Sequence, residues 1–136
     1  MKISDYKLLD VWQLSINTVK DVYVLLKELP SLERYGLADQ IRRSSVSIPS
    51  NIAEGHGRNS NKEFSRFLLI ARGSVSELET QLILCCELGY ISKDSCSEIF
   101  NKLQRISKMI YSLVNYLEKD ISKDQRPKTN DDKDKQ

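Results

Sequence analysis

The sequence predicts an all-α protein that folds as an antiparallel up-down four-helix bundle. Apolar residues recur at spacings of three and four along four long segments, and no segment shows the period-two alternation typical of a strand. The chain has only five glycines and three prolines, which leaves room for uninterrupted helices. Because the connections between the segments are short, consecutive helices are expected to run antiparallel. A length of 136 residues fits one domain with a real core.

The first helix is expected over about 5–29, where apolar residues form two neighbouring stripes. The first stripe runs from Leu8 through Val22 to Leu29. The second lies about 100° round the helix and contains Leu9, Trp12, Ile16, Val19, Tyr23 and Leu26. Together the stripes make an apolar face broader than one position in a bundle needs. Either this helix is deeply buried, or its second stripe contacts another subunit; for so short a chain we favour the subunit contact.

The second helix is expected over about 37–56, with Pro49 in its interior. An interior proline removes one backbone hydrogen bond and costs roughly 3 kcal/mol unless neighbours compensate. Pro49 leaves the carbonyl of Ser45 without its usual helical partner, in a segment rich in serine hydroxyls. We expect Gly55 and Gly57 to end this helix, as C-terminal glycines do.

A polar stripe follows the same helix, and it has two explanations. The stripe consists of Gln40, Ser44, Ser47, Asn51 and Glu54. It is either a plain solvent face or the lining of a channel or subunit seam, in which Glu54 pairs with Arg43 or Arg72. Because apolar positions lie on both sides of it, we favour a polar seam that fixes the geometry of assembly. The subunit interface is therefore expected to include Trp12, Ile16, Tyr23, Asn51 and Glu54.

The third and fourth helices are expected over about 60–88 and 92–120. Ser60 followed by Glu63 is a capping box, Gly89 closes the third helix, and Ser92 is a suitable cap for the fourth. The fourth helix carries an unbroken apolar seam with alternating spacings of four and three. The bundle is thus assigned to 1–120, and the polar, unpatterned residues 121–136 to a disordered charged tail.

The second quarter of the chain is its most electropositive part. The net charge of the whole chain is only +2. Between Arg34 and Arg72, however, seven basic and three acidic residues give a local charge of +4. The candidate contacts to nucleic-acid phosphates are Arg42, Arg43, Arg58, Lys62 and Arg66. The competing explanation is that Asp39–Arg43 and Glu63–Arg66 are ordinary intrahelical pairs and the other cations are solvated.

Catalytic and metal chemistry find little support. His56 is the only histidine, so neither a paired-histidine metal site nor the Glu-x-x-His motif of di-iron bundles can be built. Cys85, Cys86 and Cys96 are odd in number and lack C-x-x-C spacing, which argues against a disulfide framework and a zinc site. We expect no enzyme activity, no cofactor and no metal. The chain also lacks a signal peptide or long apolar run, so we expect a cytoplasmic protein without a membrane partner.

Short motifs are spread along the whole expected bundle. The second helix carries Gln40-Ile41-Arg42-Arg43-Ser44, then Ser47-Ile48-Pro49-x-Asn51-Ile52-Ala53-Glu54-Gly55. The others are Leu9-x-x-Trp12-Gln13, Pro30-x-x-Glu33-x-Tyr35-Gly36-Leu37, Ser60-x-x-Glu63-Phe64, Ala71-x-Gly73-Ser74, Glu77-Leu78 and Leu88-Gly89-Tyr90. From about 5 to 120 the chain resembles a bacterial family of four-helix bundles, the 23S rRNA intervening-sequence proteins, with no departure within the core motif.

This resemblance implies a bundle that assembles as a ring, typically a homopentamer, with a proposed role in nucleic-acid binding. It also implies a relation to the accessory bundles of diversity-generating retroelements. The family's best-known members are encoded within insertions in 23S rRNA genes, so the family name records a gene location more than an activity.

We therefore expect a non-enzymatic homo-oligomer that binds RNA or DNA through the basic residues on the outside of a ring. The alternative is a protein-binding oligomeric scaffold, or an adaptor for a nucleic-acid enzyme.

Overall fold

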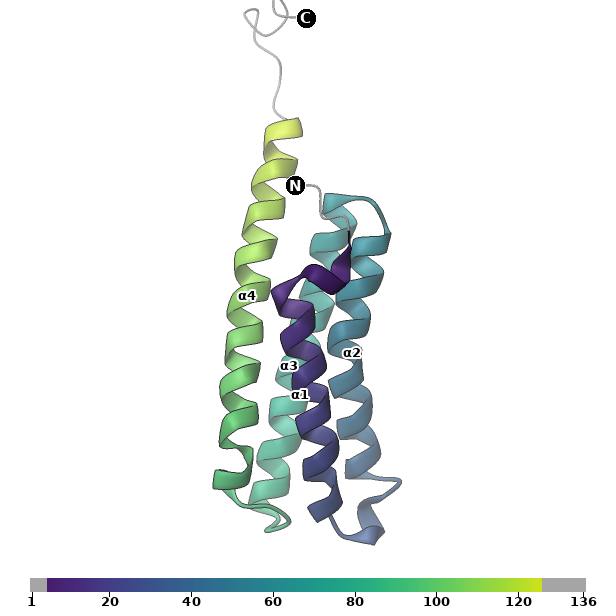
Figure 1. Ribbon diagram of the computed structural model, residues 1–136, viewed down its shortest axis with the longest axis vertical. Helices are drawn as coiled ribbons and strands as arrows, with labels where there is room; N and C mark the ends of the chain where they lie inside the picture. The colour runs from purple at the N-terminus through teal and green to yellow at the C-terminus, as the bar shows by residue number, and fades with distance from the viewer. Residues whose placement is uncertain (1–4, 126–136) are drawn as a thin grey trace, which may run out of the picture.

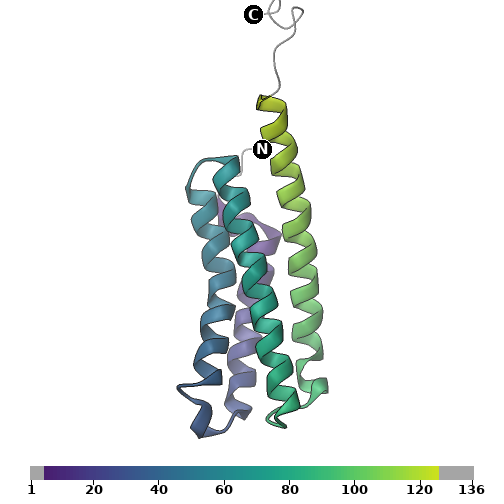
Figure 2. The same ribbon diagram turned by 180° about the vertical axis from the view of Figure 1, so that it is seen from behind.

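The computed structural model describes residues 5–125, and they form the expected four-helix bundle (Figure 1). The four long helices are α1 (Asp10–Leu25), α2 (Leu37–Gly57), α3 (Asn61–Glu87) and α4 (Lys93–Gln125). Consecutive helices run in opposite directions, and α1 packs against both α2 and α4, which closes the bundle. Seen from behind, α3 lies between α2 and α4 (Figure 2). The up-down topology predicted from the short connections is confirmed.

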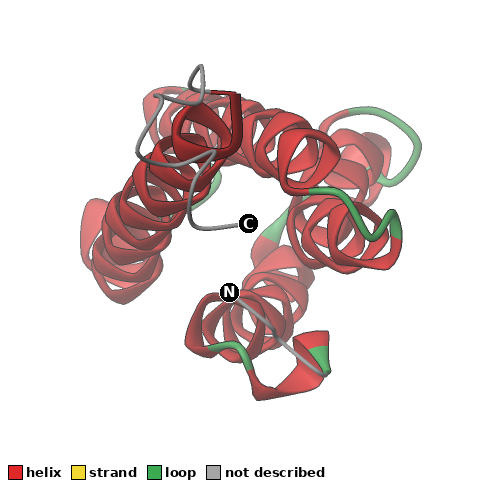
Figure 3. Ribbon diagram, turned by 90° about the horizontal axis from the view of Figure 1, so that it is seen from above, coloured by secondary structure: helices red, strands yellow, loops and turns green. Residues whose placement is uncertain are grey.

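All regular structure in the described residues is helical, and the connections lie at the two ends of the bundle (Figure 3). No helix within residues 5–125 combines the length and the apolar character that a membrane span requires.

The first helix is shorter than the expected 5–29. A 3-10 turn over Tyr6–Leu8 comes first, because the Asp5 side chain accepts a hydrogen bond from the backbone N–H of Lys7 at 2.9 Å. Leu9 is extended, so α1 begins only at Asp10. At the other end, α1 gives way to a second 3-10 turn over Leu26–Glu28. Leu29 is extended, as the residue before a proline usually is.

The other helices follow their sequence signals closely. The Ser60 hydroxyl accepts from the N–H of Glu63 at 3.2 Å, and that of Ser92 from the N–H of Ser95 at 3.1 Å, so both predicted caps are confirmed. Helix α4 continues to Gln125, past the expected end at 120, because no helix breaker precedes Pro127. Residues 126–136 of the expected tail lie outside the described part of the chain.

The core is built from one apolar stripe on each helix, and that of α4 matches the predicted seam. Its buried residues include Ile99, Leu103, Ile106, Ile110 and Leu117, whereas Leu113 of the seam is only partly buried and the neighbouring Val114 is buried in its place. On α1, the stripe of Val11, Val22 and Leu25 is buried, together with the two small polar residues between them, Ser15 and Thr18. The hydroxyls of Ser15 and Thr18 donate to carbonyls one turn upstream, which satisfies them inside the core.

Helices α2 and α3 make the most extensive contact in the bundle, and Gly55 lies within it. A Cβ added to Gly55 would lie 2.5 Å from the Cβ of Phe67, well inside van der Waals contact. Gly55 is therefore a packing glycine within α2, not the helix terminator expected from sequence. The helix ends two residues later at Gly57.

The polar stripe of α2 is used mostly within the chain, at the same contact. The Ser44 hydroxyl donates to Gln81 Oε1 at 2.7 Å, and the hydroxyls of Ser47 and Ser74 are 2.8 Å apart. Asn51 turns back to the carbonyl of Ser47 at 2.8 Å. The prediction of a subunit seam is therefore wrong at Ser44 and Ser47, which join α2 to α3 of the same molecule.

At the end of the bundle opposite the α2–α3 turn, the connection between α1 and α2 contacts the connection between α3 and α4. Glu33, in the 3-10 turn Ser31–Glu33, accepts a hydrogen bond from the Tyr90 hydroxyl at 3.1 Å. Tyr90 is placed by the end of α3, where Gly89 adopts a φ of 77°. The N–H groups of Gly89 and Tyr90 donate to the carbonyls of Cys86 and Cys85, each at 3.0 Å, as in a Schellman motif.

Replacing Gly55 tests the close approach of α2 and α3. Gly55→Ala places a methyl group against Phe67, and overpacking of this kind costs about 1–3 kcal/mol. Gly73→Ala is the matched control, because Gly73 also lies within a helix but its added Cβ would meet open space. We expect the control to stabilise the fold by about 0.8–1 kcal/mol through helix propensity. Urea denaturation, monitored by circular dichroism, measures the free energy of unfolding of both variants. Equal effects of the two substitutions would contradict this packing.

Removal of the Tyr90 hydroxyl tests the contact between the two connections. The hydrogen bond to Glu33 raises the pKa of Tyr90, because it stabilises the neutral phenol. Its contribution to stability is therefore complete below the ordinary tyrosine pKa of about 10 and is lost as the pH rises through the higher folded value. We expect Tyr90→Phe to lower the urea midpoint at pH 7 and to differ less from the parent above pH 10. Tyr116→Phe, at an exposed site on α4, should leave the midpoint unchanged at both pH values.

Candidate nucleic-acid interface

Three of the five predicted basic residues gather at the junction between α2 and α3. Arg58 follows the last residue of α2, Asn59 makes the turn with a φ of 54°, and Ser60 caps α3. Lys62 and Arg66 then follow on the first two turns of α3, four residues apart and so on one face. The tight turn therefore brings cations from two helices together at one end of the bundle.

The two arginines of this junction are held over one aromatic ring. The guanidinium carbon of Arg58 lies 5.0 Å from the centroid of the Phe67 ring, and that of Arg66 lies 4.6 Å from it. Phe67 is itself buried, because it fills the space that Gly55 leaves. Cation–π contacts at such distances orient a guanidinium as well as attract it. The two guanidinium groups are thus presented against the same ring.

Each arginine also pairs with a glutamate one turn away. Arg58 Nη2 lies 3.0 Å from Glu54 Oε1, and Arg66 Nε lies 2.9 Å from Glu63 Oε2. The hydrogen bond from Arg66 holds the pKa of Glu63 below its ordinary value, and Glu63 in turn raises the pKa of Arg66. All four side chains are solvent-accessible, so each pair adds little to stability. The intrahelical Glu63–Arg66 pair named as the competing explanation is therefore present.

Lys62 adds the excess positive charge of the junction. Its side chain is exposed, and its charge also helps to lower the pKa of Glu63. With Arg58 and Arg66 it makes three cations against the two carboxylates of Glu54 and Glu63. The junction of one protomer thus carries a local charge of only about +1.

The predicted residues Arg42 and Arg43 lie elsewhere, near the other end of α2. Both pair with Asp39, Arg43 Nε at 3.0 Å and Arg42 Nη2 at 3.6 Å, and Arg42 also donates to the carbonyl of Arg34 at 3.0 Å. With a rise of 1.5 Å per residue, they are roughly 22 Å along the helix from Arg58. The structure therefore separates the five predicted cations into two groups.

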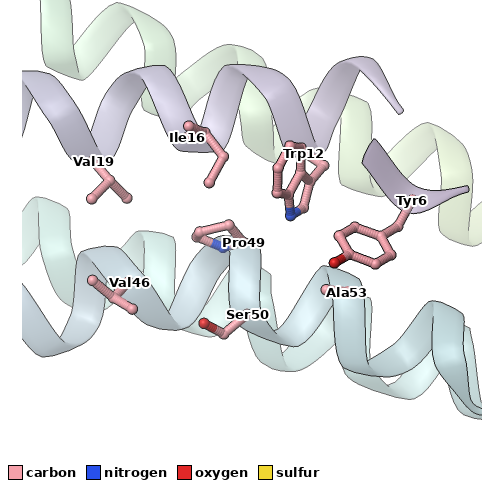
Figure 4. Close-up of a pocket in the computed structure, with 8 residues that line it drawn as sticks. All are labelled: Tyr6, Trp12, Ile16, Val19, Val46, Pro49, Ser50 and Ala53. Atoms are coloured by element: carbon pink, nitrogen blue, oxygen red, sulfur yellow. The ribbon is translucent and has the colours of Figure 1, made fainter. Parts of the chain in front are cut away.

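An apolar groove of about 290 Å³ runs between α1 and α2 (Figure 4). The ring of Pro49 points from α2 towards α1, where Ile16 and Trp12 point back towards it. Pro49 is buried, and α2 remains one continuous helix through it. The groove is lined by Tyr6, Trp12, Ile16, Val19, Val46, Pro49, Ser50 and Ala53. The proline therefore contributes a rigid apolar surface to the contact between α1 and α2.

A second, more open groove of about 410 Å³ continues from the first. It shares Val46 and Ser50 with the apolar groove and adds Tyr23, Arg42 and Arg43. The apolar surface between α1 and α2 thus ends at a pair of arginines.

The predicted interface residues have different surroundings. Trp12 and Ile16 line the apolar groove, and Tyr23, which is 46% exposed, lines the second one. Asn51 and Glu54 already have partners in this chain, Ser47 and Arg58. The expected pairing of Glu54 with Arg43 or Arg72 is wrong, because Arg58 is one helical turn away and Arg43 is held by Asp39.

Several residues that shape these surfaces were not singled out from sequence. Phe67 is an apolar residue of α3, and its role depends on its contact with Gly55. Tyr6 reaches the groove because of the 3-10 turn, and its ring lies 5.4 Å from that of Trp12. The aromatic spacing alone does not reveal either role, although an arginine next to a phenylalanine is a usable signal for Arg66 and Phe67.

The surroundings of His56 are aromatic. Its ring lies 6.0 Å from that of Tyr6 and 5.8 Å from that of Phe64, both edge-to-face. Among residues 5–125, no three side chains of histidine, cysteine, aspartate or glutamate lie together as a metal site would require.

Comparison with known proteins places this geometry in a family. Residues 7–112 match the family model of the 23S rRNA-intervening sequence proteins. The chain is also similar to a solved structure from Bacteroides thetaiotaomicron VPI-5482, a protein of unknown function from the S23 ribosomal protein family. The two are 28% identical, with a TM-score of 0.71 over 76% of this chain and 97% of the other. No curated protein matches the sequence. The chain belongs to the 23S rRNA-intervening sequence protein family.

Proposed function

We propose that this protein is a non-enzymatic, cytoplasmic homo-oligomer that binds RNA or DNA at the junction of α2 and α3. Arg58, Lys62 and Arg66 supply the phosphate contacts. The observation that carries the proposal is the presentation of two guanidinium groups over Phe67, beside an exposed lysine. Because Phe67 already supports both guanidinium groups, they lose less conformational entropy when they meet a phosphate than unsupported side chains would.

The proposal depends on oligomerisation, because the junction of one protomer, with a local charge of about +1, would attract nucleic acid only weakly. Copies arranged as a ring, typically of five in the family, repeat the junction around one end of the assembly. Counterion release then adds up over the repeated contacts, and the affinity rises steeply with their number. Arg42 and Arg43 form a second contact on each protomer, roughly 22 Å away along α2.

A second candidate function is a protein-binding scaffold, and the apolar groove between α1 and α2 favours it. Trp12, Ile16 and Pro49 line a concave surface that an apolar segment of another protein fits. The neighbouring arginines Arg42 and Arg43 suit a segment with acidic residues at one end. In this case the partner is a nucleic-acid enzyme for which the bundle acts as an adaptor.

Charge reversal at the junction separates the two functions. In Arg58→Glu/Lys62→Glu we expect binding of labelled structured RNA and duplex DNA to be lost at low salt, as measured by fluorescence anisotropy. The parent should show a steep negative dependence of log affinity on log salt, with each phosphate contact adding about 0.7–0.9 to the slope.

The matched control carries the same change of charge far from the junction, as Arg105→Glu/Lys108→Glu on the exposed side of α4. An equal loss in this control would mean that only net charge matters. A flat titration of the parent at low salt would favour the scaffold.

The oligomeric state provides an independent test. Light scattering should give one species well above the protomer mass of 15.7 kDa, and near five times that mass for a pentamer. Val46→Glu, in a residue that is 41% exposed and lines the apolar groove, should shift the protein towards the monomer. Leu32→Glu, at a residue that is 77% exposed and lines neither groove, should not. A clean monomer of the parent protein contradicts the ring.

A further inference from the structure

Two cysteines face each other where α3 ends and α4 begins. The sulfur of Cys86 lies 3.9 Å from the sulfur of Cys96, ten residues further along the chain. Cys86 is the penultimate residue of α3, and Cys96 lies in the first turn of α4. A disulfide has an S–S distance of about 2.0 Å, so the two sulfurs need to approach by about 2 Å. Such an approach requires a change of side-chain torsion or a shift of the connection between the helices.

The three cysteines differ in their access to solvent. Cys85 and Cys96 are fully buried, whereas Cys86 is partly exposed. Burial raises the pKa of Cys85 to about 11 and that of Cys96 to about 12, so both are held as thiols at neutral pH. An oxidant from solvent therefore meets Cys86 first. Cys85, the next residue on the same helix, points about 100° away from Cys86.

We propose that Cys86 and Cys96 are a redox pair, which a low-molecular-weight disulfide converts into an intramolecular disulfide between α3 and α4. The proposal is independent of the nucleic-acid function. All three cysteines are free in the structure, which is thus the reduced form.

The reaction takes two exchange steps. The Cys86 thiolate first attacks one sulfur of the small disulfide and releases one small thiolate, which leaves a mixed disulfide on Cys86. Cys96 then loses its proton and attacks the Cys86 sulfur, which releases the second small thiolate. In total, two protein thiols are oxidised and one small disulfide is reduced to two thiols. Because burial raises the pKa of Cys96, the second step should become faster as the pH rises.

The bond would lock one end of the bundle. It would join the last turn of α3 to the first turn of α4 across Gly89 and Tyr90, next to the hydrogen bond between Tyr90 and Glu33. Closing this loop restricts the unfolded chain, so the oxidised form should melt at a higher temperature than the reduced form.

The test uses the full chain, reduced and then incubated with glutathione disulfide, and follows intact mass, free thiols and peptide maps. We expect the protein to lose two hydrogens, to keep one free thiol and to give a peptide that joins Cys86 to Cys96. Cys85→Ala should form the same bond and keep no free thiol. Cys96→Ala should stop as a glutathione adduct on Cys86, and Cys86→Ala should keep both of its thiols.

Several results would overturn the proposal. These are three free thiols in the parent after prolonged incubation at pH 8.5, a bond that involves Cys85, and a bond between two molecules. A Cys86–Cys96 bond that leaves the melting temperature unchanged would overturn the stabilising role assigned to it. Circular dichroism of each variant confirms that it is folded before the comparison is made.

Discussion

The close approach of α2 and α3 at Gly55 is the constraint on which the candidate interface depends. Because Gly55 has no side chain, Phe67 can pack directly against the backbone of α2. The hydroxyl pair Ser47–Ser74 and the Ser44–Gln81 hydrogen bond then fix the register of the two helices further along the same contact. Phe67 in turn supports the guanidinium groups of Arg58 and Arg66. A packing requirement inside the bundle thereby determines where two surface cations lie.

The same chain presents two surfaces of different chemistry. The junction of α2 and α3 is polar, with charges that are largely balanced by Glu54 and Glu63. The surface between α1 and α2 is apolar, because Pro49 and Trp12 face each other across it. A ring of such protomers can use one surface for assembly and keep the other for its ligand. In this account the modest charge of each protomer becomes effective only through repetition.

Local signals predicted the parts of the fold that local interactions determine. The bounds of α2 and α3 followed from Ser60 and the flanking glycines, and the seam of α4 followed from its period. The ends of α1 did not follow from sequence. A 3-10 turn capped by the Asp5 side chain precedes the helix, and a second 3-10 turn follows it. The role of Gly55 and the partner of Glu54 were also misassigned. Both depend on which of several candidate neighbours comes into contact, and a spacing pattern does not contain that information.

The most direct test of the proposed interface is an NMR titration of the protein with a structured RNA, observing the arginine Nε–H and tryptophan indole N–H signals. The account predicts shifts concentrated at Arg58 and Arg66. It also predicts an unchanged signal for Trp12, the single tryptophan, which reports on the apolar groove. Shifts confined to Trp12, or none at the junction of α2 and α3, would contradict the assignment of that junction as the nucleic-acid interface.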